Sequence, residues 1–404
     1  MATIKFQTLD RPKSPFTAFV LVNAVALVAG LAAALYMESR GHVVTGMTNQ
    51  VVWGLPHVFA VFLIVSASGA LNLASISSVF GREAYKPYAR LSAVLAIALL
   101  AGGLAVLVLD LGRADRLAVA MTTYNFRSIF AWNVYLYTGF MAVVGAYLFA
   151  MTDRGVSKDA RVVRALGTLA FVWRLVLTTG TGSIFGFLVA REAYHGPMMA
   201  PLFVAASLYY GLAFATLVLA LMGAAAGAEL VPDEMAGKFR GLLTIFALAT
   251  AYFVAAHFLT KLYATADRPM VMFLLRDGGP YPLAFWGGEI LLGTVGPLLI
   301  LWRAGGRAAD LRKLAAASAL VLFGGLCQMY VFIVGGQAWP LDLFPGYRVS
   351  SSFYDGAINA YSPSLPEALL GIGGVALAML IVALAVRTLP FLPKTGAARD
   401  AAGA

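Results

Sequence analysis

Ten long runs of apolar residues follow one another along the 404-residue chain. A helix of about 20 apolar residues is long enough to cross the hydrocarbon core of a bilayer. Only 12% of the residues are charged, which is about half the share found in soluble domains. The sequence therefore excludes a soluble enzyme and a disordered chain, and it predicts an all-α polytopic membrane protein, a bundle of about ten transmembrane helices. The runs lie at 15–36, 51–76, 90–110, 128–151, 162–190, 198–224, 239–263, 281–302, 313–335 and 365–388.

Basic residues are distributed unevenly between the two sets of loops. The N-terminus, the even-numbered loops and the C-terminus hold 19 of the 29 Lys and Arg residues, the odd-numbered loops hold 9, and Arg174 lies inside a run. The positive-inside rule then places both termini in the cytoplasm. We expect the protein in the bacterial cytoplasmic (inner) membrane. We expect a cytoplasmic N-terminus at 1–14, a single transmembrane domain at 15–390 with an external loop at 336–364, and a cytoplasmic tail at 391–404.

Composition also limits the chemistry that the chain can perform. A single cysteine, Cys327, excludes an intrachain disulfide and any Cys-ligated zinc or iron–sulfur cluster built from this chain alone. The net charge of +10 reflects orientation and contact with anionic lipid, and we expect no nucleic-acid partner. The external loop is a docking surface, a lid or an ordinary connector. Its aromatic, acidic and proline residues include Trp339, Pro340, Asp342, Pro345, Tyr347 and Tyr354.

Polar side chains gather toward the predicted outer ends of several helices, where their shared depth suggests one pocket. A quinone or quinol suits such a pocket, because its apolar tail stays in lipid while its head group needs hydrogen-bond partners and a proton acceptor. His57 is the expected proton acceptor or donor, because the ordinary pKa of histidine lies near neutrality. A histidine that only packs helices is the alternative. The expected pocket residues are Trp53, His57, Asp110, Arg113, Asn125, Trp132, Thr178, Ser183 and Glu289.

Two ion pairs are expected from spacing and depth. Asp110 and Arg113 are three residues apart, which allows a local pair on one helix; the pair is a boundary salt bridge, an anchor of the pocket or part of a proton exit. Arg174 lies in the middle of a helix and needs a counter-ion, for which Glu289 is the candidate.

The second run carries a polar stripe that begins at His57. At 100° per residue, His57 and three later polar residues lie within about 60° of one another. The stripe is half of a water-filled proton path, or it consists of small polar residues that hold helices together. The expected path comprises Ser68, Asn72, Ser75, Arg174 and Glu289.

Four histidines limit haem binding. His42 and His195 lie in loops, and His57 and His257 lie within helices, so one b-type haem is possible but a transmembrane pair of haems is not. We expect no redox metal in this chain, and electrons taken from a quinol must leave through another subunit. A b-type cytochrome that uses His57 and His257 is one alternative.

A proton-coupled secondary transporter is the other alternative, with Glu289 and Arg174 as a midplane site. Many transporters have paired halves and broken helices, and the sequence shows neither clearly.

Five motifs together resemble the NrfD membrane-subunit family of polysulfide reductases, over most of the chain. The ten runs point to the larger, ten-helix branch of that family, and the sequence around the second run is most similar to its DsrP subunits. The motifs are Trp53-Gly54-Leu55-Pro56-His57, Ser66-Ala67-Ser68-Gly69-Ala70, Asp110-Leu111-Gly112-Arg113, Asn125-Phe126-Arg127-Ser128 and Phe285-Trp286-Gly287-Gly288-Glu289.

The resemblance implies a haem-free anchor that exchanges electrons with menaquinone or ubiquinone near the periplasmic face, with His57 lining the quinone site. It implies docking of a ferredoxin-like iron–sulfur subunit, and it allows for a multihaem cytochrome c and further redox subunits. It also implies a role in sulfur metabolism. An Asn of some members is Gly54 here, and a tyrosine of the fifth helix has no counterpart beside Thr178 and Ser183.

Overall fold

The computed structural model describes residues 5–10, 12–303, 309–341 and 356–394. Within these residues, ten helical spans are long and apolar enough to cross a membrane, which confirms the predicted all-α polytopic fold. The spans are Ser14–Arg40 (α1), Leu55–Ser78 (α2, Leu55–Ala70, and α3, Asn72–Ser78), Glu83–Leu109 (η2, Glu83–Tyr88, and α4, Ala89–Leu109), Ile129–Thr152 (α6), Ala160–Gly186 (α7), Met199–Ala226 (α8), Asp233–Tyr263 (α9), Pro280–Trp302 (α11, Pro280–Pro282, η6, Leu283–Val295, and α12, Gly296–Trp302), Leu311–Ala338 (from α13, Ala309–Tyr330, through η7, Val331–Gly335, to α14, Gly336–Ala338) and Leu365–Thr388 (α15). The shorter elements are β1 (Phe6–Gln7), η1 (His42–Val44), η3 (Ala114–Arg116), α5 (Leu117–Thr122), η4 (Val156–Lys158), α10 (Arg268–Met272), η5 (Phe273–Asp277) and β2 (Leu392–Pro393).

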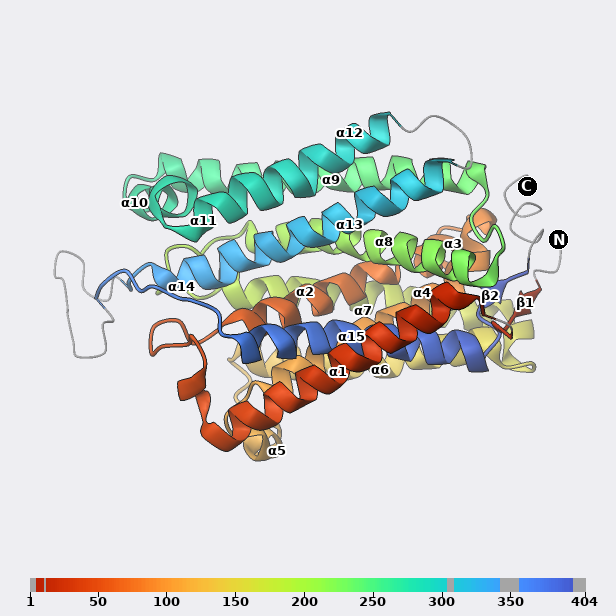
Figure 1. Cartoon of the computed structure of the whole chain (residues 1–404), viewed down its shortest axis with the longest axis horizontal. Coiled ribbons are helices and arrows are strands. Elements are labelled where there is room, and N and C mark those ends of the chain that lie inside the picture. Colours follow the sequence, from red (N-terminus) through yellow and green to blue (C-terminus); the bar gives the residue numbers. More distant parts are fainter. Residues whose placement is uncertain (1–4, 11, 304–308, 342–355, 395–404) are drawn as a thin grey trace.

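The helices run roughly along one axis, with α2 and α8 in the interior (Figure 1). α2 packs against α4 and α8, α1 packs along α15, and α6 pairs with α7. α13 lies between α8 and the π-helical stretch η6. The crossing of α2 and α8 requires glycine, because a Cβ on Gly69 would lie 1.6 Å from the Ser207 carbonyl oxygen. Close approach through glycine is typical of helices packed in a membrane.

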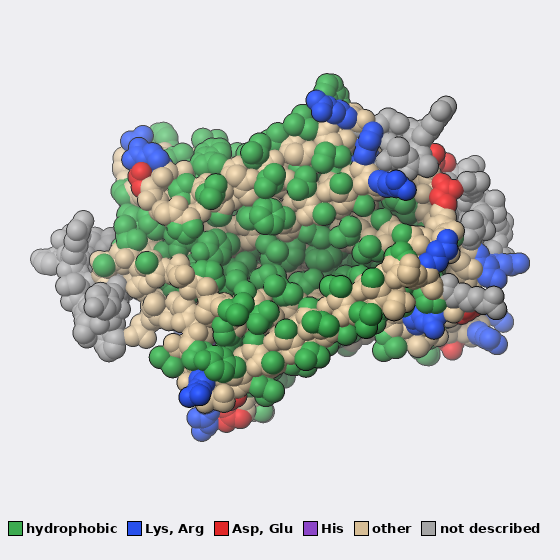
Figure 2. All heavy atoms as spheres, viewed as in Figure 1, with side chains coloured by type: hydrophobic (Ala, Val, Ile, Leu, Met, Phe, Trp, Pro, Cys, Tyr) green, Lys and Arg blue, Asp and Glu red, His purple; other side chains and the backbone are tan. Residues whose placement is uncertain are grey.

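The face of the bundle seen in Figure 2 is apolar over its middle, and its Lys and Arg side chains gather toward the two ends. α1 illustrates this: Leu21, Val25 and Leu35 are among its exposed side chains. Water would penalise such a surface, whereas lipid accommodates it. The distribution agrees with a helical bundle that crosses a bilayer along its long axis.

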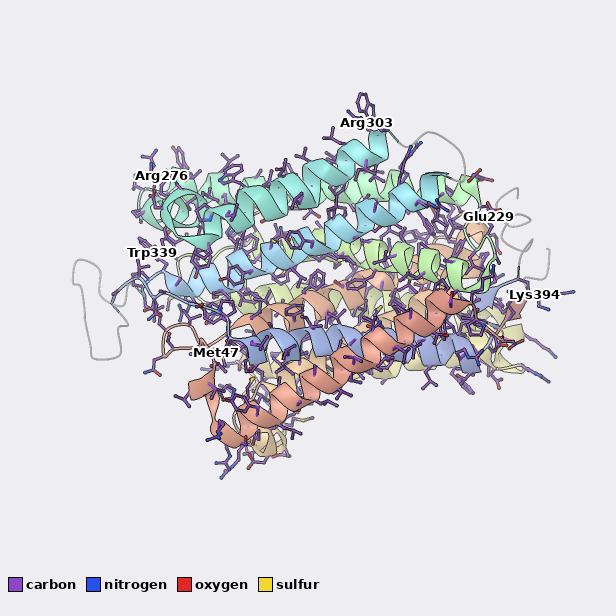
Figure 3. The ribbon with its side chains drawn as sticks, viewed as in Figure 1. Met47, Glu229, Arg276, Arg303, Trp339 and Lys394 are labelled. Carbon is purple, nitrogen blue, oxygen red and sulfur yellow. The ribbon has the colours of Figure 1, made fainter. Side chains whose placement is uncertain are left out.

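The odd-numbered loops share one end of the bundle, as the alternation of ten spans requires. Met47, Arg276 and Trp339 lie toward this end, and Glu229 and Lys394 lie toward the other (Figure 3). We call the first the loop end and the second the terminal end. At the terminal end β1 pairs antiparallel with β2, so the chain segments before α1 and after α15 are joined by backbone hydrogen bonds.

Two features of the spans differ from the expected pattern. The second span is interrupted at Leu71, and the Ser92 hydroxyl of α4 bonds both sides of the break, donating to the Ala70 carbonyl (2.6 Å) and accepting from the Ala74 N–H (3.2 Å). The ninth span continues through α14, so the connector expected at 336–364 begins only at Trp339. Asp342, Pro345, Tyr347 and Tyr354 lie outside the described residues.

Candidate functional site

The start of α15 holds the backbone just before His57. The Leu55 N–H donates to the Tyr361 hydroxyl (2.7 Å), which in turn donates to the Glu367 carboxylate (2.7 Å). Burial, and then this bond to Glu367, raises the pKa of Tyr361, so the phenol remains a neutral donor. Gly54 leaves space for the contact, because a Cβ there would lie 2.4 Å from Glu367 Oε1. His57 is thereby placed on the first turn of α2.

His57 faces Asp110, which follows the last residue of α4. Nδ1 of His57 lies 2.7 Å from Oδ2 of Asp110. The two atoms are close enough for an ion pair, but their angles are not those of a hydrogen bond. The Asp110 side chain is 1% exposed and that of His57 is 16% exposed. The carboxylate is therefore enclosed, while the imidazole reaches the edge of the bundle. No hydrogen bond within the described part of the chain engages Nε2 of His57, which leaves this nitrogen for a ligand.

The expected ion pair between Asp110 and Arg113 is wrong. α4 ends at Leu109, and Arg113 has a non-helical backbone (φ −139°, ψ 64°), so the two residues do not share a helical turn. Arg113 instead bonds Asp115 at 2.8 Å, and both side chains are exposed. The hydrogen bond from Arg113 lowers the pKa of Asp115. Arg113 belongs to the surface of the loop end, and the partner of Asp110 is His57.

A second histidine approaches Asp110 from the end of α1. Nε2 of His42 lies 3.0 Å from the Asp110 carbonyl oxygen and 3.9 Å from Oδ1 of its carboxylate. The ring rests on Gly112, where a Cβ would lie 3.1 Å from Nδ1 of His42. The His42 side chain is 31% exposed. Asp110 therefore lies between an imidazole at the bundle edge and a more exposed imidazole at the loop end.

Trp53 covers the His57 ring and belongs to an aromatic cluster. Its ring is stacked on His57, with centroids 6.1 Å apart and planes inclined by 21°. It also stacks on Tyr194, at 6.2 Å and 16°, and contacts Phe130 and Phe185. Phe130 is exposed on the lipid side, so the cluster reaches from the bundle interior to its edge. Such a surface suits a flat ring inserted beside His57.

Gln337 fixes the backbone of Trp53. Its Oε1 accepts from the Val52 and Trp53 N–H groups (3.1 and 3.0 Å), and its Nε2 donates to the Trp53 carbonyl (2.9 Å). Gln50 and Arg191 both donate to the Gln337 carbonyl, each at 3.1 Å. The segment before α2 is therefore hydrogen-bonded to α14, at the loop end of the bundle.

The predicted polar stripe of α2 and α3 meets α7 at a buried cluster. Arg174 is 2% exposed; it donates to the Ser68 carbonyl (3.4 Å) and to the side-chain oxygen of Asn72 (3.3 Å). The Thr178 hydroxyl donates to the Ser68 hydroxyl (2.5 Å). Among the described contacts, the Ser75 hydroxyl donates to the Leu71 carbonyl (3.1 Å), at the break between α2 and α3. The structure therefore brings together Ser68, Asn72 and Arg174 of the expected path. Thr178, which was expected in the pocket of His57, belongs to this cluster instead.

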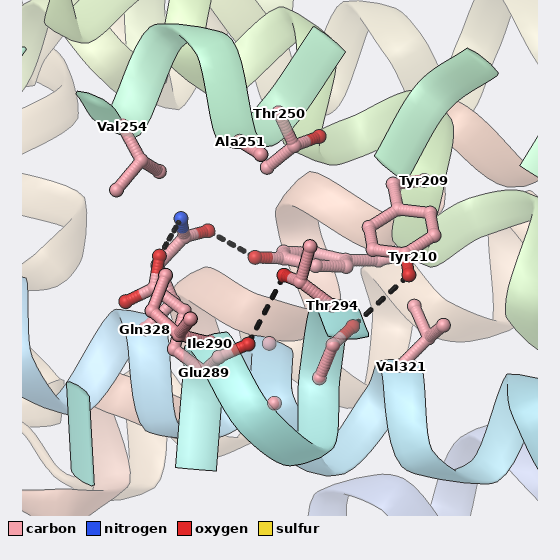
Figure 4. Close-up of a pocket in the computed structure, with 13 residues that line it drawn as sticks. Tyr209, Tyr210, Thr250, Ala251, Val254, Glu289, Ile290, Thr294, Val321 and Gln328 are labelled. Carbon is pink, nitrogen blue, oxygen red and sulfur yellow. Dashed lines mark hydrogen bonds between the residues drawn. The ribbon is translucent and has the colours of Figure 1, made fainter. Parts of the chain in front are cut away.

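Glu289 lies in a different polar cluster, between η6, α8 and α13 (Figure 4). Gln328 Nε2 donates to Glu289 Oε1 (2.7 Å), and the Tyr210 hydroxyl donates to Gln328 Oε1. The expected Arg174–Glu289 pair is wrong, because helix packing turns each toward other partners. Oε2 of Glu289 is buried without a hydrogen-bond partner. A cavity lies beside it. The space open to the centre of a water molecule there is about 10 Å³, which is room for one water.

The structure does not group three further expected pocket residues with His57. Asn125 is exposed, and its side-chain oxygen accepts from the Arg127 N–H in a loop turn. Trp132 is 46% exposed and donates to the Phe126 carbonyl (2.9 Å). Ser183 is buried in the last turn of α7, toward the loop end. Of the residues expected in one pocket, the structure groups Trp53, His57 and Asp110.

The two helix histidines have separate surroundings. The ring of His257 is buried and lies edge-on to Phe258 (5.3 Å) and Phe332 (5.5 Å), whereas His57 contacts Trp53 and Asp110. These contacts do not describe two axial ligands that face each other across one haem.

Sequence reasoning missed three residues of this site: His42, Tyr194 and Gln337. Each lies in or beside a connecting segment, more than 10 residues from His57, so helix periodicity could not relate them. The only available signal was that all three belong to odd-numbered loops or helix ends, which topology places at the end of the bundle where His57 lies.

Comparison with known proteins gives consistent matches over the chain. The model of the family described as polysulphide reductase, NrfD, matches residues 43–340. The "Hdr-like menaquinol oxidoreductase integral membrane subunit" of Archaeoglobus fulgidus is 27% identical, covering 97% of each chain. A putative dimethyl sulfoxide reductase membrane subunit of Halobacterium salinarum is 28% identical, covering 94% of this chain and 92% of the relative. A selenate reductase subunit of Mesobacillus selenatarsenatis is 23% identical, covering 93% and 94%.

Proposed function

The chain belongs to the NrfD polysulphide reductase family, and from this premise we propose that it exchanges electrons and protons with the quinone pool at the loop end of the bundle. The observation that carries the proposal is the enclosed Asp110 carboxylate in contact with the His57 imidazole, beneath the Trp53 ring. The relative from Archaeoglobus fulgidus, named as a menaquinol oxidoreductase subunit, supports a quinol as substrate.

In this proposal the His57 side chain is the proton acceptor. The two quinol hydroxyls donate their protons to Nε2 one after the other, the first leaving before the second arrives. Each time, the Asp110 carboxylate stabilises the imidazolium that forms, because opposite charges attract strongly in a low dielectric. The Trp53 face holds the flat head group at the lipid edge. The two electrons pass to a ferredoxin-like iron–sulfur subunit docked at the loop end; a multihaem cytochrome c would receive them later. In quinone reduction the same groups act in reverse.

Asp110→Asn tests the site in the complex purified in mild detergent. We expect quinol to reduce the iron–sulfur subunit, seen as bleaching of its visible absorbance, about 10²-fold more slowly in Asp110→Asn. The amide has the shape of the carboxylate but cannot stabilise an imidazolium. Asp115→Asn is the matched control, because Asp115 lies at the same end and pairs with Arg113 on the surface. Full activity of Asp110→Asn, or a complex without an iron–sulfur subunit, would contradict the proposal.

The two inner polar clusters are proposed parts of a proton path. In the first cluster Ser68 donates to the Arg174 carbonyl and Arg174 donates to Asn72. In the second, the unpartnered Oε2 of Glu289 adjoins room for one water. In proteoliposomes we expect Glu289→Gln to lower the number of protons moved per quinol oxidised, because the amide cannot bind and release a proton. Measurement with a pH-sensitive dye in the lumen checks this; an unchanged ratio removes Glu289 from the path.

The proposal also covers the orientation of the bundle in the membrane and the metabolic pathway that the complex serves. The excess of basic residues at the N-terminus, even-numbered loops and C-terminus supports a cytoplasmic terminal end and a periplasmic loop end. A role in sulfur metabolism is supported by the family resemblance, and the subunits that co-purify with the chain would identify the pathway. The break at Leu71 does little to support the transporter alternative. The Ser92 hydroxyl satisfies the backbone groups on both sides of the break, so they are not left for a substrate.

A further inference from the structure

A proton accepted at a buried site must reach water, and Asp110 alone cannot release it because its side chain is 1% exposed. Two side-chain contacts of this carboxylate are described, and both are to imidazoles. Oδ2 faces Nδ1 of His57, and Oδ1 faces Nε2 of His42. Exposure changes along this row, from 16% at His57, through the sealed carboxylate, to 31% at His42. The row therefore ends at the surface of the loop end.

We propose that His42 is the proton-release residue, which receives the proton from the His57–Asp110 pair and passes it to external water. The proposal rests on the proposed quinol oxidation at His57. The two quinol O–H bonds break in turn, and each time an N–H bond forms at Nε2 of His57 while Nδ1 gives its proton to Asp110, so the relay runs once for each of the two protons. His42, with its own proton on Nδ1, takes the proton from Asp110 at Nε2, which lies 3.9 Å from Oδ1, and the Asp110 carbonyl, 3.0 Å from Nε2, accepts the new N–H. Nδ1 of His42 then releases its proton to bulk water, which returns the ring to the neutral form. The electrons leave separately to the iron–sulfur subunit.

The position of His42 is built into the local backbone. Gly41, with φ +78°, ends α1 in a conformation that favours glycine and turns the chain into η1. Thr45 closes η1 by donating its N–H (3.0 Å) and its hydroxyl (2.6 Å) to the His42 carbonyl. Gly112 lacks the Cβ that would push the ring away. His42 is therefore held beside Asp110 by two independent segments, although it lies 68 residues away in the sequence.

Quinol oxidation by the purified complex tests the relay. We expect His42→Ala to lower kcat at least about tenfold with KM unchanged, and millimolar imidazole to restore most of the rate, because a diffusing base replaces the missing one. His42→Gln, which retains a donor for the Asp110 carbonyl but cannot carry a proton, should be equally slow with an unchanged thermal midpoint. His195→Ala, an exposed loop histidine, is the matched control.

The outcomes separate the relay from the function on which it rests. Full turnover of His42→Gln, or a slow His42→Ala enzyme that imidazole does not restore, would overturn the relay while leaving quinol oxidation at His57 intact. Full turnover of Asp110→Asn would instead remove the quinol site itself, and the relay with it. Slow turnover of both His42 variants with rescue of His42→Ala supports the relay.

Discussion

Quinol oxidation by the assembled complex is expected to fall about 10²–10⁴-fold in His57→Ala, which is the range that a positioned acid–base group contributes. The physical reason is that no imidazole then lies at the edge of the bundle to take the quinol proton, and the enclosed Asp110 carboxylate is 1% exposed. The fall should be in kcat more than in KM, since the aromatic cluster around Trp53 still binds the head group. Stopped-flow oxidation of a soluble quinol analogue measures both constants.

The His57→Ala experiment needs an enzyme that is still folded, because a buried carboxylate without its partner is costly. His57→Gln, which keeps polar contact with Asp110, provides that check and should be as slow as His57→Ala. His195→Ala controls for the loss of any histidine at this end. Wild-type turnover in His57→Ala would show that the proton acceptor is another group.

Gln337→Ala is expected to have the largest effect on stability. The substitution removes the acceptor of the Val52 and Trp53 N–H groups and the donor to the Trp53 carbonyl. Leaving a buried polar group unpaired costs about 1–3 kcal/mol, so the thermal midpoint of the detergent-solubilised protein should fall by several degrees. Because Trp53 loses its fixed position over His57, the KM for quinol should rise as well.

Gln337→Glu is the matched variant. It retains an oxygen for the two N–H groups but loses the donor to the Trp53 carbonyl, so its thermal midpoint should lie between those of the wild type and Gln337→Ala. Gln337→Ala with unchanged thermal midpoint and unchanged KM would mean that the contacts to Trp53 neither stabilise the fold nor position the site.

The membrane fold followed from local pattern. Each span is recognisable within its own 20 or so residues, because lipid requires continuous apolar helix and the bundle adds no contrary demand at that scale. The family was also recognisable from the sequence, because its motifs are short runs such as Trp53–His57. The break at Leu71 could not be predicted from the sequence, because the Ser92 hydroxyl of the distant helix α4 bonds the backbone groups on both sides of it.

The membership of the candidate site depended on tertiary packing. Depth along a helix is visible in the sequence, and Trp53, His57 and Asp110, three of the nine residues expected in one pocket, lie together in the structure. Depth does not tell which direction a side chain faces around the helix axis, so Thr178 and Glu289 were assigned to a pocket from which packing separates them. His42 and Gln337 reach the site from connecting segments, and their partners are set by how distant helices meet, which is a property of the whole bundle and of no single segment.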